Sequence, residues 1–79
     1  VLHIYPNPAT CSVNIDFAYE GKVDIQVFQI DGKIVNESQI TFSNHQSYLH
    51  IGEVPAGIYI IVGRAESGER LFEEKIVTY

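Results

Sequence analysis

The chain has no methionine, no tryptophan and only one cysteine, Cys11, among its 79 residues. A single cysteine cannot form a disulfide within the chain, so the fold must depend on its core. Lys and Arg account for only five residues against ten Asp and Glu, which gives a net charge of −5. Nucleic-acid binding needs clustered basic residues that contact phosphates, so this scattered basic set argues against a nucleic-acid partner.

Long hydrophobic runs are also missing, because the longest is the stretch from residue 58 to residue 62. A membrane helix needs about 20 apolar residues, so the sequence predicts no membrane span. Without a methionine, Val1 is not expected to be the start of translation. We therefore interpret residues 1–79 as a single domain from a larger precursor, whose targeting sequence would lie upstream.

The chain does contain short segments in which apolar and polar residues alternate. Residues 13–17 and 23–27 show this period of two, with mostly β-branched residues at the apolar positions, which is typical of strands. Residues 70–78 predict a last strand. Residues 58–62 are apolar throughout, which predicts a central strand covered on both faces. Such strands, with turns about every ten residues, predict an all-β, Ig-like antiparallel β-sandwich of about seven strands.

Turn residues separate these segments. Asp31-Gly32 predicts a hairpin with a type I′ turn, and Ser67-Gly68 suggests another. Gly57, just before the predicted central strand, is expected to need a positive φ or a close backbone approach. The segment 5–9 contains Pro6 and Pro8, which lack the N–H that a strand ladder uses, so we expect an ordered loop there.

Side chains capable of catalysis or metal binding form no recognisable set. The three histidines have no partner at metal-ligand spacing, and Cys11 has no base near it in the sequence. Four glutamates near the last hairpin are better interpreted as a solvated sheet edge than as a glycosidase pair: Glu66, Glu69, Glu73 and Glu74. We predict that the chain is no enzyme and needs no metal or other cofactor.

The aromatic residues allow two interpretations. Most lie in or beside predicted strands, where packing in the core is the default expectation: Tyr5, Phe17, Phe28, Tyr59 and Phe72. Tyr19 and Tyr48 lie near turns, where an aromatic ring can remain exposed. Exposed aromatic rings gathered on one sheet would instead favour a carbohydrate-binding module.

Three segments together resemble one family. The opening 4–9, which includes Tyr5-Pro6-Asn7-Pro8-Ala9, is followed by Val13-Asn14-Ile15. This resembles the opening of C-terminal sorting domains of the type IX secretion system. The middle segment 27–35, with Asp31-Gly32, resembles the hairpin of that family. The segments 54–61, with Gly57 and Tyr59, and Lys75-Ile76-Val77 resemble its closing pattern.

The resemblance implies that the chain is a C-terminal export label of a secreted protein, recognised by the type IX translocon. The domain would fold in the periplasm, follow a cargo domain on its N-terminal side, and direct that cargo to the cell surface or the medium. A sortase-like surface peptidase would typically remove it. The residues that match the family's motifs serve either recognition or the fold alone: Pro6, Asn7, Pro8, Asp31, Gly32, Gly57, Tyr59, Lys75, Ile76 and Val77. Two alternatives stay open, an uncleaved structural module of the secretion machinery and an accessory carbohydrate-binding or stabilising module of a secreted enzyme.

Overall fold

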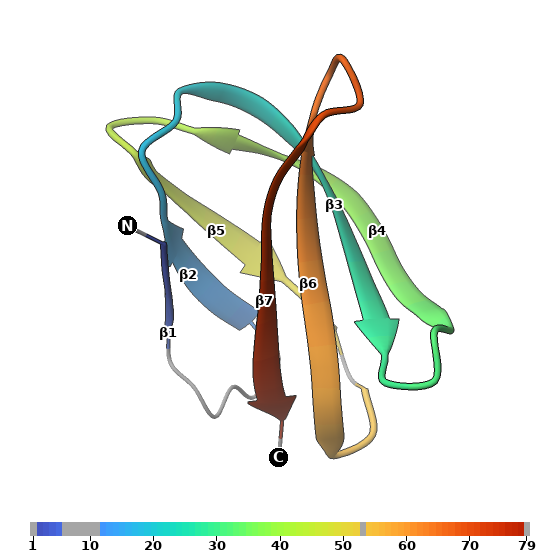
Figure 1. Ribbon diagram of the computed structural model, residues 1–79. Coiled ribbons are helices and arrows are strands. Elements are labelled where there is room, and N and C mark those ends of the chain that lie inside the picture. The colour runs from blue at the N-terminus through green and yellow to red at the C-terminus, as the bar shows by residue number, and fades with distance from the viewer. Residues whose placement is uncertain (1, 6–11, 53, 79) are drawn as a thin grey trace.

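The computed structural model describes residues 2–5, 12–52 and 54–78, and these form two antiparallel sheets packed face to face (Figure 1). The smaller sheet has the order β1-β2-β5 and the larger sheet the order β4-β3-β6-β7. This confirms the predicted seven-stranded β-sandwich. The strands are β1 (His3–Tyr5), β2 (Ser12–Asp16), β3 (Gly21–Gln29), β4 (Ile34–Phe42), β5 (Gln46–His50), β6 (Gly57–Ala65) and β7 (Arg70–Thr78). Within the described part of the chain, no helix has the length and hydropathy that crossing a membrane requires.

The core forms where the alternating strands of both sheets turn their apolar positions inward. Val13 and Ile15 of β2 are fully buried, and so are Val23 and Val27 of β3. At one end of the core, four aromatic rings make edge-to-face contacts, with ring centroids 5.0 Å apart at the closest pair, Phe17 and Phe72. The other rings of this cluster are Tyr19 and Phe42. The inner face is therefore specified by the period of two seen in the sequence.

The expectation that β6 is covered on both faces is only half right. β6 does lie between β3 and β7 in the larger sheet, and Tyr59 and Ile61 are buried on its inner face. On its outer face, however, Ile58 is 42% exposed and Ile60 is only partly buried. Residues 58–62 are apolar throughout because the outer side of the sheet also carries apolar residues here. No second layer among the described residues covers that side.

The predicted role of Gly57 is wrong. Its φ lies outside the positive region, because the chain has already entered the extended backbone of β6. A Cβ added there would meet only the Tyr59 ring, at 3.9 Å. The close approach occurs instead at Gly63, where an added Cβ would lie 2.4 Å from Cζ of Phe72 on the neighbouring strand.

The turn at Asp31-Gly32 is a hairpin turn, as predicted, but not of type I′. Among its central residues only Gly32 has a positive φ, of 96°. The N–H of Gly32 donates to the Gln29 carbonyl at 2.8 Å, and the N–H of Gln29 donates to the Lys33 carbonyl at 2.7 Å. This is a three-residue loop in which a left-handed glycine follows a type I turn. Asp31 stabilises it by accepting the N–H of Lys33 at 3.1 Å.

The hairpin between β6 and β7 repeats this construction. Gly68 has a φ of 94°, and its N–H donates to the Ala65 carbonyl at 2.8 Å. Type I′ geometry occurs elsewhere, at Asn44 and His45, whose φ values are 55° and 63°. The flanking residues Ser43 and Gln46 exchange both backbone hydrogen bonds, at 3.0 and 3.1 Å. Without a glycine this turn is strained, because side chains disfavour positive φ.

Glu20 supports the strained turn from a different loop. Its two carboxylate oxygens accept the N–H of Asn44 at 3.2 Å and the N–H of His45 at 3.1 Å. The side chain thus connects the loop before β3 to the hairpin between β4 and β5, more than twenty residues away. These two hydrogen bonds to Glu20, which we call the clamp, also position the corner where β4 ends in one sheet and β5 begins in the other.

We expect Glu20→Ala to lower the free energy of unfolding by about 1–2 kcal/mol, because two backbone donors lose a charged acceptor at a strained turn. Urea denaturation followed by circular dichroism measures this change. Glu66→Ala is the matched control, since Glu66 is an exposed glutamate in the β6–β7 hairpin. Its loss should cost less than about 0.5 kcal/mol. Equal losses for the two variants would show that the clamp contributes no stability.

Candidate recognition surface

The segment Lys75-Ile76-Val77 lies on β7, and its three side chains divide between the two faces of the sheet. Ile76 points inward, is fully buried, and lies opposite Tyr59 of β6. Lys75 and Val77 point outward and lie opposite Ile60 and Ile58. Of the three residues, only Lys75 and Val77 are therefore accessible to a partner.

These outward residues belong to a larger apolar area on the larger sheet. In the register of the strands, Ile34, Phe28, Ile60 and Lys75 form a row across β4, β3, β6 and β7. Ile58 and Val77 form the next pair toward the end of the molecule. We call this area the outer apolar surface, and it consists of Phe28, Ile34, Ile58, Ile60, Lys75 and Val77. Its members Ile34, Ile58 and Val77 are 42%, 42% and 37% exposed.

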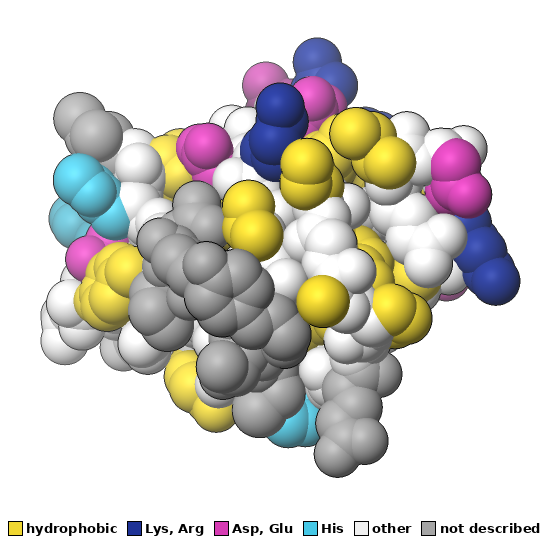
Figure 2. Space-filling view, turned by 90° about the horizontal axis from the view of Figure 1, so that it is seen from below, with side chains coloured by type: hydrophobic (Ala, Val, Ile, Leu, Met, Phe, Trp, Pro, Cys, Tyr) yellow, Lys and Arg dark blue, Asp and Glu magenta, His cyan; other side chains and the backbone are white. Residues whose placement is uncertain are grey.

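Figure 2 views the molecule from the end at which β7 finishes. Hydrophobic side chains gather in groups on this end, with Lys or Arg and Asp or Glu side chains beside them. No ion pair joins Lys75 to a carboxylate among the residues that the structure describes. Lys75 is thus an exposed cation next to hydrocarbon.

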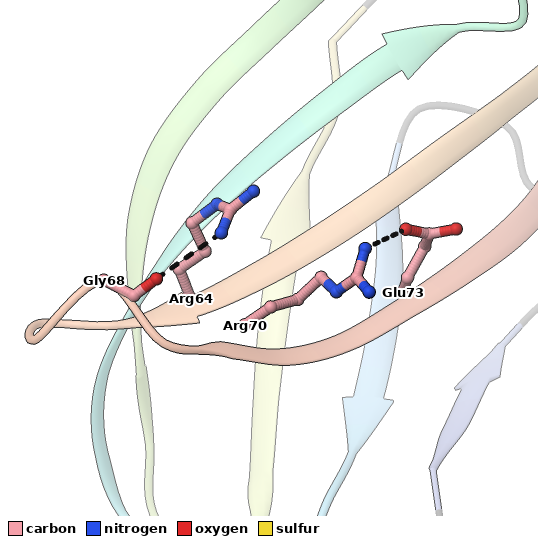
Figure 3. Close-up of polar contacts among 4 residues, drawn as sticks. All are labelled: Arg64, Gly68, Arg70 and Glu73. Carbon is pink, nitrogen blue, oxygen red and sulfur yellow. Dashed lines mark hydrogen bonds and ion pairs between the residues drawn. The ribbon is translucent and has the colours of Figure 1, made fainter.

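The opposite end of the same sheet face is polar. Arg64 and Arg70 lie opposite each other on β6 and β7, and each finds a separate acceptor (Figure 3). Arg64 Nη1 donates to the Gly68 carbonyl at 3.4 Å, and Arg70 Nη1 pairs with Glu73 Oε1 at 2.9 Å. Both partners of the ion pair are at least half exposed, so it contributes little stability. Glu66, Glu69, Glu73 and Glu74 are all exposed, as expected for a solvated edge.

Tyr59 and Thr78 hold the end of β7 in place. The hydroxyl of Tyr59 donates to the carbonyl of Pro55, in the segment before β6. The hydroxyl of Thr78 donates to the same carbonyl at 3.2 Å, and only 1% of Thr78 is exposed. The burial of Tyr59 was expected from the sequence, and its acceptor carbonyl also accepts the hydroxyl of Thr78 on β7, the strand that carries Lys75.

The structure brings several of the motif residues together. Asp31, Gly57 and Tyr59 line one shallow pocket of about 240 Å³ between the β3–β4 hairpin and the start of β6, and Gly32 completes that hairpin. Ile58 lines this pocket and also belongs to the outer apolar surface. Lys75, Ile76 and Val77 lie on the neighbouring strand. Pro6, Asn7 and Pro8 lie outside the described residues.

Sequence reasoning missed Phe28, Ile34, Ile58 and Ile60 as surface residues. A signal was present for Ile58 and Ile60, because both occupy outward positions in β6, whose inward positions Tyr59 and Ile61 are also apolar. A strand that is apolar on both faces indicates either a second covering layer or an exposed apolar area. Only the arrangement of the sheets distinguishes the two cases.

This combination of a small sandwich, an ordered last strand and an exposed apolar area is typical of a domain that acts by being recognised. Residues 3–78 match the family described as the secretion system C-terminal sorting domain. The chain belongs to this family, and it is a sorting domain of the type IX secretion system. It directs export to the cell surface or secretion, as its resemblance to the family implied.

Two solved structures share the fold. One is PorZ of Porphyromonas gingivalis, described as an essential bacterial surface component of the type IX secretion system. It aligns with 99% of this chain at a TM-score of 0.67 and 11% identity, although the chain covers only 11% of PorZ. The other is CopC of Methylosinus trichosporium OB3b, with a TM-score of 0.59 and 16% identity over 99% of this chain and 91% of CopC. At such low identity both likenesses show the fold alone. No curated protein matches the sequence.

Proposed function

We propose that the type IX translocon recognises this domain through the outer apolar surface, with Lys75 as its charged contact. The observation that carries the proposal is that Lys75 forms no ion pair among the described residues and continues a row of apolar side chains across the sheet. An exposed cation surrounded by hydrocarbon fits a partner surface that is itself apolar and carries a carboxylate. Soluble domains seldom leave aliphatic residues gathered on a sheet face without a binding partner.

The remaining parts of the export route are proposals that the family resemblance supports. The domain would follow a cargo domain on its N-terminal side, cross the periplasm in folded form, and be removed by a sortase-like surface peptidase. We propose that the domain itself is no enzyme and that the chemistry belongs to these partners. In this role the folded surface is the signal, and the core stabilises the strand pairing that brings the surface residues together.

A reporter fusion tests the recognition surface. Residues 1–79 are fused to the C-terminus of a periplasmic reporter in a bacterium that has the type IX system, and the reporter on the surface and in the medium is measured. We expect the unmutated fusion to be exported and Lys75→Ala to retain most of the reporter in the periplasm. The purified variant should melt normally, since one exposed charge contributes about 0–1 kcal/mol.

Lys22→Ala is the matched control for this experiment. Lys22 is an exposed lysine on β3, and it lies opposite Thr41, toward the polar end of the same sheet. Its loss should leave export unchanged. Normal export of Lys75→Ala would contradict the role of Lys75. An unmutated fusion that stays in the periplasm would contradict the proposal that these 79 residues are a sufficient signal.

A further inference from the structure

The outer face of the smaller sheet carries two exposed tyrosines in one row. Tyr5 on β1 lies opposite Asn14 on β2, and Asn14 lies opposite Tyr48 on β5. Tyr5 is 43% exposed and Tyr48 is 58% exposed. The expectation that Tyr5 packs in the core is therefore wrong, because its strand position points away from the core. The next row pairs His3 with Asp16 and Asp16 with Gln46.

The spacing of this row suits an extended ligand. β1 and β5 flank β2, so the backbones that carry the two tyrosines lie about 10 Å apart, which is twice the spacing of neighbouring strands. The amide of Asn14, which offers two donors and one acceptor oxygen, lies between them. Two aromatic surfaces with a polar group between them match the alternation of C–H faces and hydroxyl groups along a chain of sugars.

A carboxylate extends the row and orders one of the rings. The Tyr5 hydroxyl donates to Asp16 Oδ1 at 3.3 Å. Partial desolvation, together with the charge of Asp16 and this hydrogen bond, raises the pKa of Tyr5 above its ordinary value. The hydrogen bond links the Tyr5 hydroxyl to the neighbouring strand β2, and the carboxylate of Asp16 keeps further acceptor capacity for a ligand hydroxyl.

The charge of this face excludes one class of sugar. All five Lys and Arg residues lie on the larger sheet or in its β3–β4 hairpin, and none lies on β1, β2 or β5. Asp16 contributes a negative charge instead. Besides Asp16 the face carries the imidazoles of His3 and His50, but it has no Lys or Arg to pair with the carboxylates or sulfates of an acidic polysaccharide. A neutral ligand is therefore the better complement to this face.

We propose that the Tyr5–Asn14–Tyr48 row is a binding site for a neutral linear oligosaccharide. The two tyrosine rings pack against the C–H faces of sugars, and Asn14 and Asp16 exchange hydrogen bonds with the hydroxyl groups between them. This function goes beyond sorting, and it does not depend on the outer apolar surface, which belongs to the other sheet. A domain with both sites would carry an export signal on one sheet and a glycan contact on the other.

Titration of the 79-residue chain with cellohexaose, chitohexaose and laminarihexaose, followed by NMR, tests the proposal. We expect at least one of these neutral probes to shift the side-chain amide signals of Asn14 and the backbone signals of β1, β2 and β5. Calorimetry should then show that Tyr48→Ala weakens binding of that probe at least about tenfold, a change of about 1.4 kcal/mol. Tyr48→Phe should stay within about threefold of the parent, because the ring rather than the hydroxyl makes the stacking contact.

Ile30→Ala is the control for nonspecific loss, since Ile30 is 69% exposed in the β3–β4 hairpin, outside the smaller sheet. It should bind as the parent does, and all variants should show the parental melting temperature. Three results would overturn the proposal: no shift with any probe at about 10 mM, which corresponds to a negligible affinity; unchanged binding by Tyr48→Ala; or tighter binding of polygalacturonate than of the neutral probes. Export of the Tyr48→Ala fusion should be normal, so failure here leaves the sorting function untouched.

Discussion

Gly63→Ala is expected to lower the free energy of unfolding by about 2–3 kcal/mol, the upper part of the range for an overpacked core. The added methyl group would lie 2.4 Å from Cζ of Phe72, which is closer than any real contact. Phe72 cannot simply move aside, because it is 7% exposed and packs edge-on against Phe17 and Phe42. For a domain of this size the melting temperature should fall by roughly 10 °C or more, which differential scanning calorimetry measures.

Two further variants give this prediction its control and its mechanism. Gly57→Ala adds the same methyl group at the start of the same strand, where it meets only ordinary contact with Tyr59, so it should cost less than about 1 kcal/mol. Phe72→Leu removes the ring that obstructs the methyl group. The double variant Gly63→Ala with Phe72→Leu should therefore lose less stability than the sum of the two single variants. Simple additivity would show that the pair does not compete for one space.

The position of the core could be predicted because it depends on local alternation. In β2 and β3 every second residue is β-branched or aromatic, and a strand places such residues on one face whatever its partners are. The predicted central position of residues 58–62 is confirmed, although it was inferred from an apolar run and not from alternation, and the expected cover on the outer face is incomplete. The number of strands followed from the spacing of turns, which is also a local property.

The turn types could not be predicted, because they depend on contacts distant in the sequence. Asp31-Gly32 contains the residues of a type I′ turn, yet Ile30 joins the loop and only Gly32 takes a positive φ. Type I′ geometry occurs instead at Asn44 and His45, a pair without glycine. What makes it possible there is the carboxylate of Glu20, which accepts both backbone N–H groups. No pattern within four residues of that turn indicates its partner.

The two surfaces illustrate the same limit. Tyr5 and Tyr48 are separated by 43 residues and come into one row only through the registers of β1 with β2 and β2 with β5. The sequence showed both tyrosines but not that they share a face. Ile34 and Val77, similarly, belong to one surface only because β3 and β6 lie between their strands. Motif residues were found from the sequence, whereas the neighbours that give them a chemical environment required the fold.

Ile76→Ala is expected to abolish export by unfolding the domain, although it changes no exposed atom. Ile76 is fully buried, with 0% of its surface exposed, and lies opposite Tyr59 in the core. Removing a buried isoleucine to the β-carbon costs about 2–5 kcal/mol, which is comparable to the roughly 3–5 kcal/mol of stability that a single core of this size supplies. Val77→Ala is the matched variant, since it shortens the next residue of the same strand on the 37% exposed outer side. It should lose less than about 1 kcal/mol.

The comparison separates a folded signal from a linear one. If the translocon recognises the folded surface, the export of Ile76→Ala should follow its folded fraction, which thermal unfolding of the purified chain measures. Export should recover when the growth temperature is lowered to the range in which the variant is folded. Val77→Ala should remain folded at every growth temperature and show a reduction in export that does not change with temperature, because it alters the outer apolar surface directly. If Ile76→Ala is exported while unfolded, recognition reads the last residues as an extended segment, and the proposed surface spanning β3, β4, β6 and β7 is wrong.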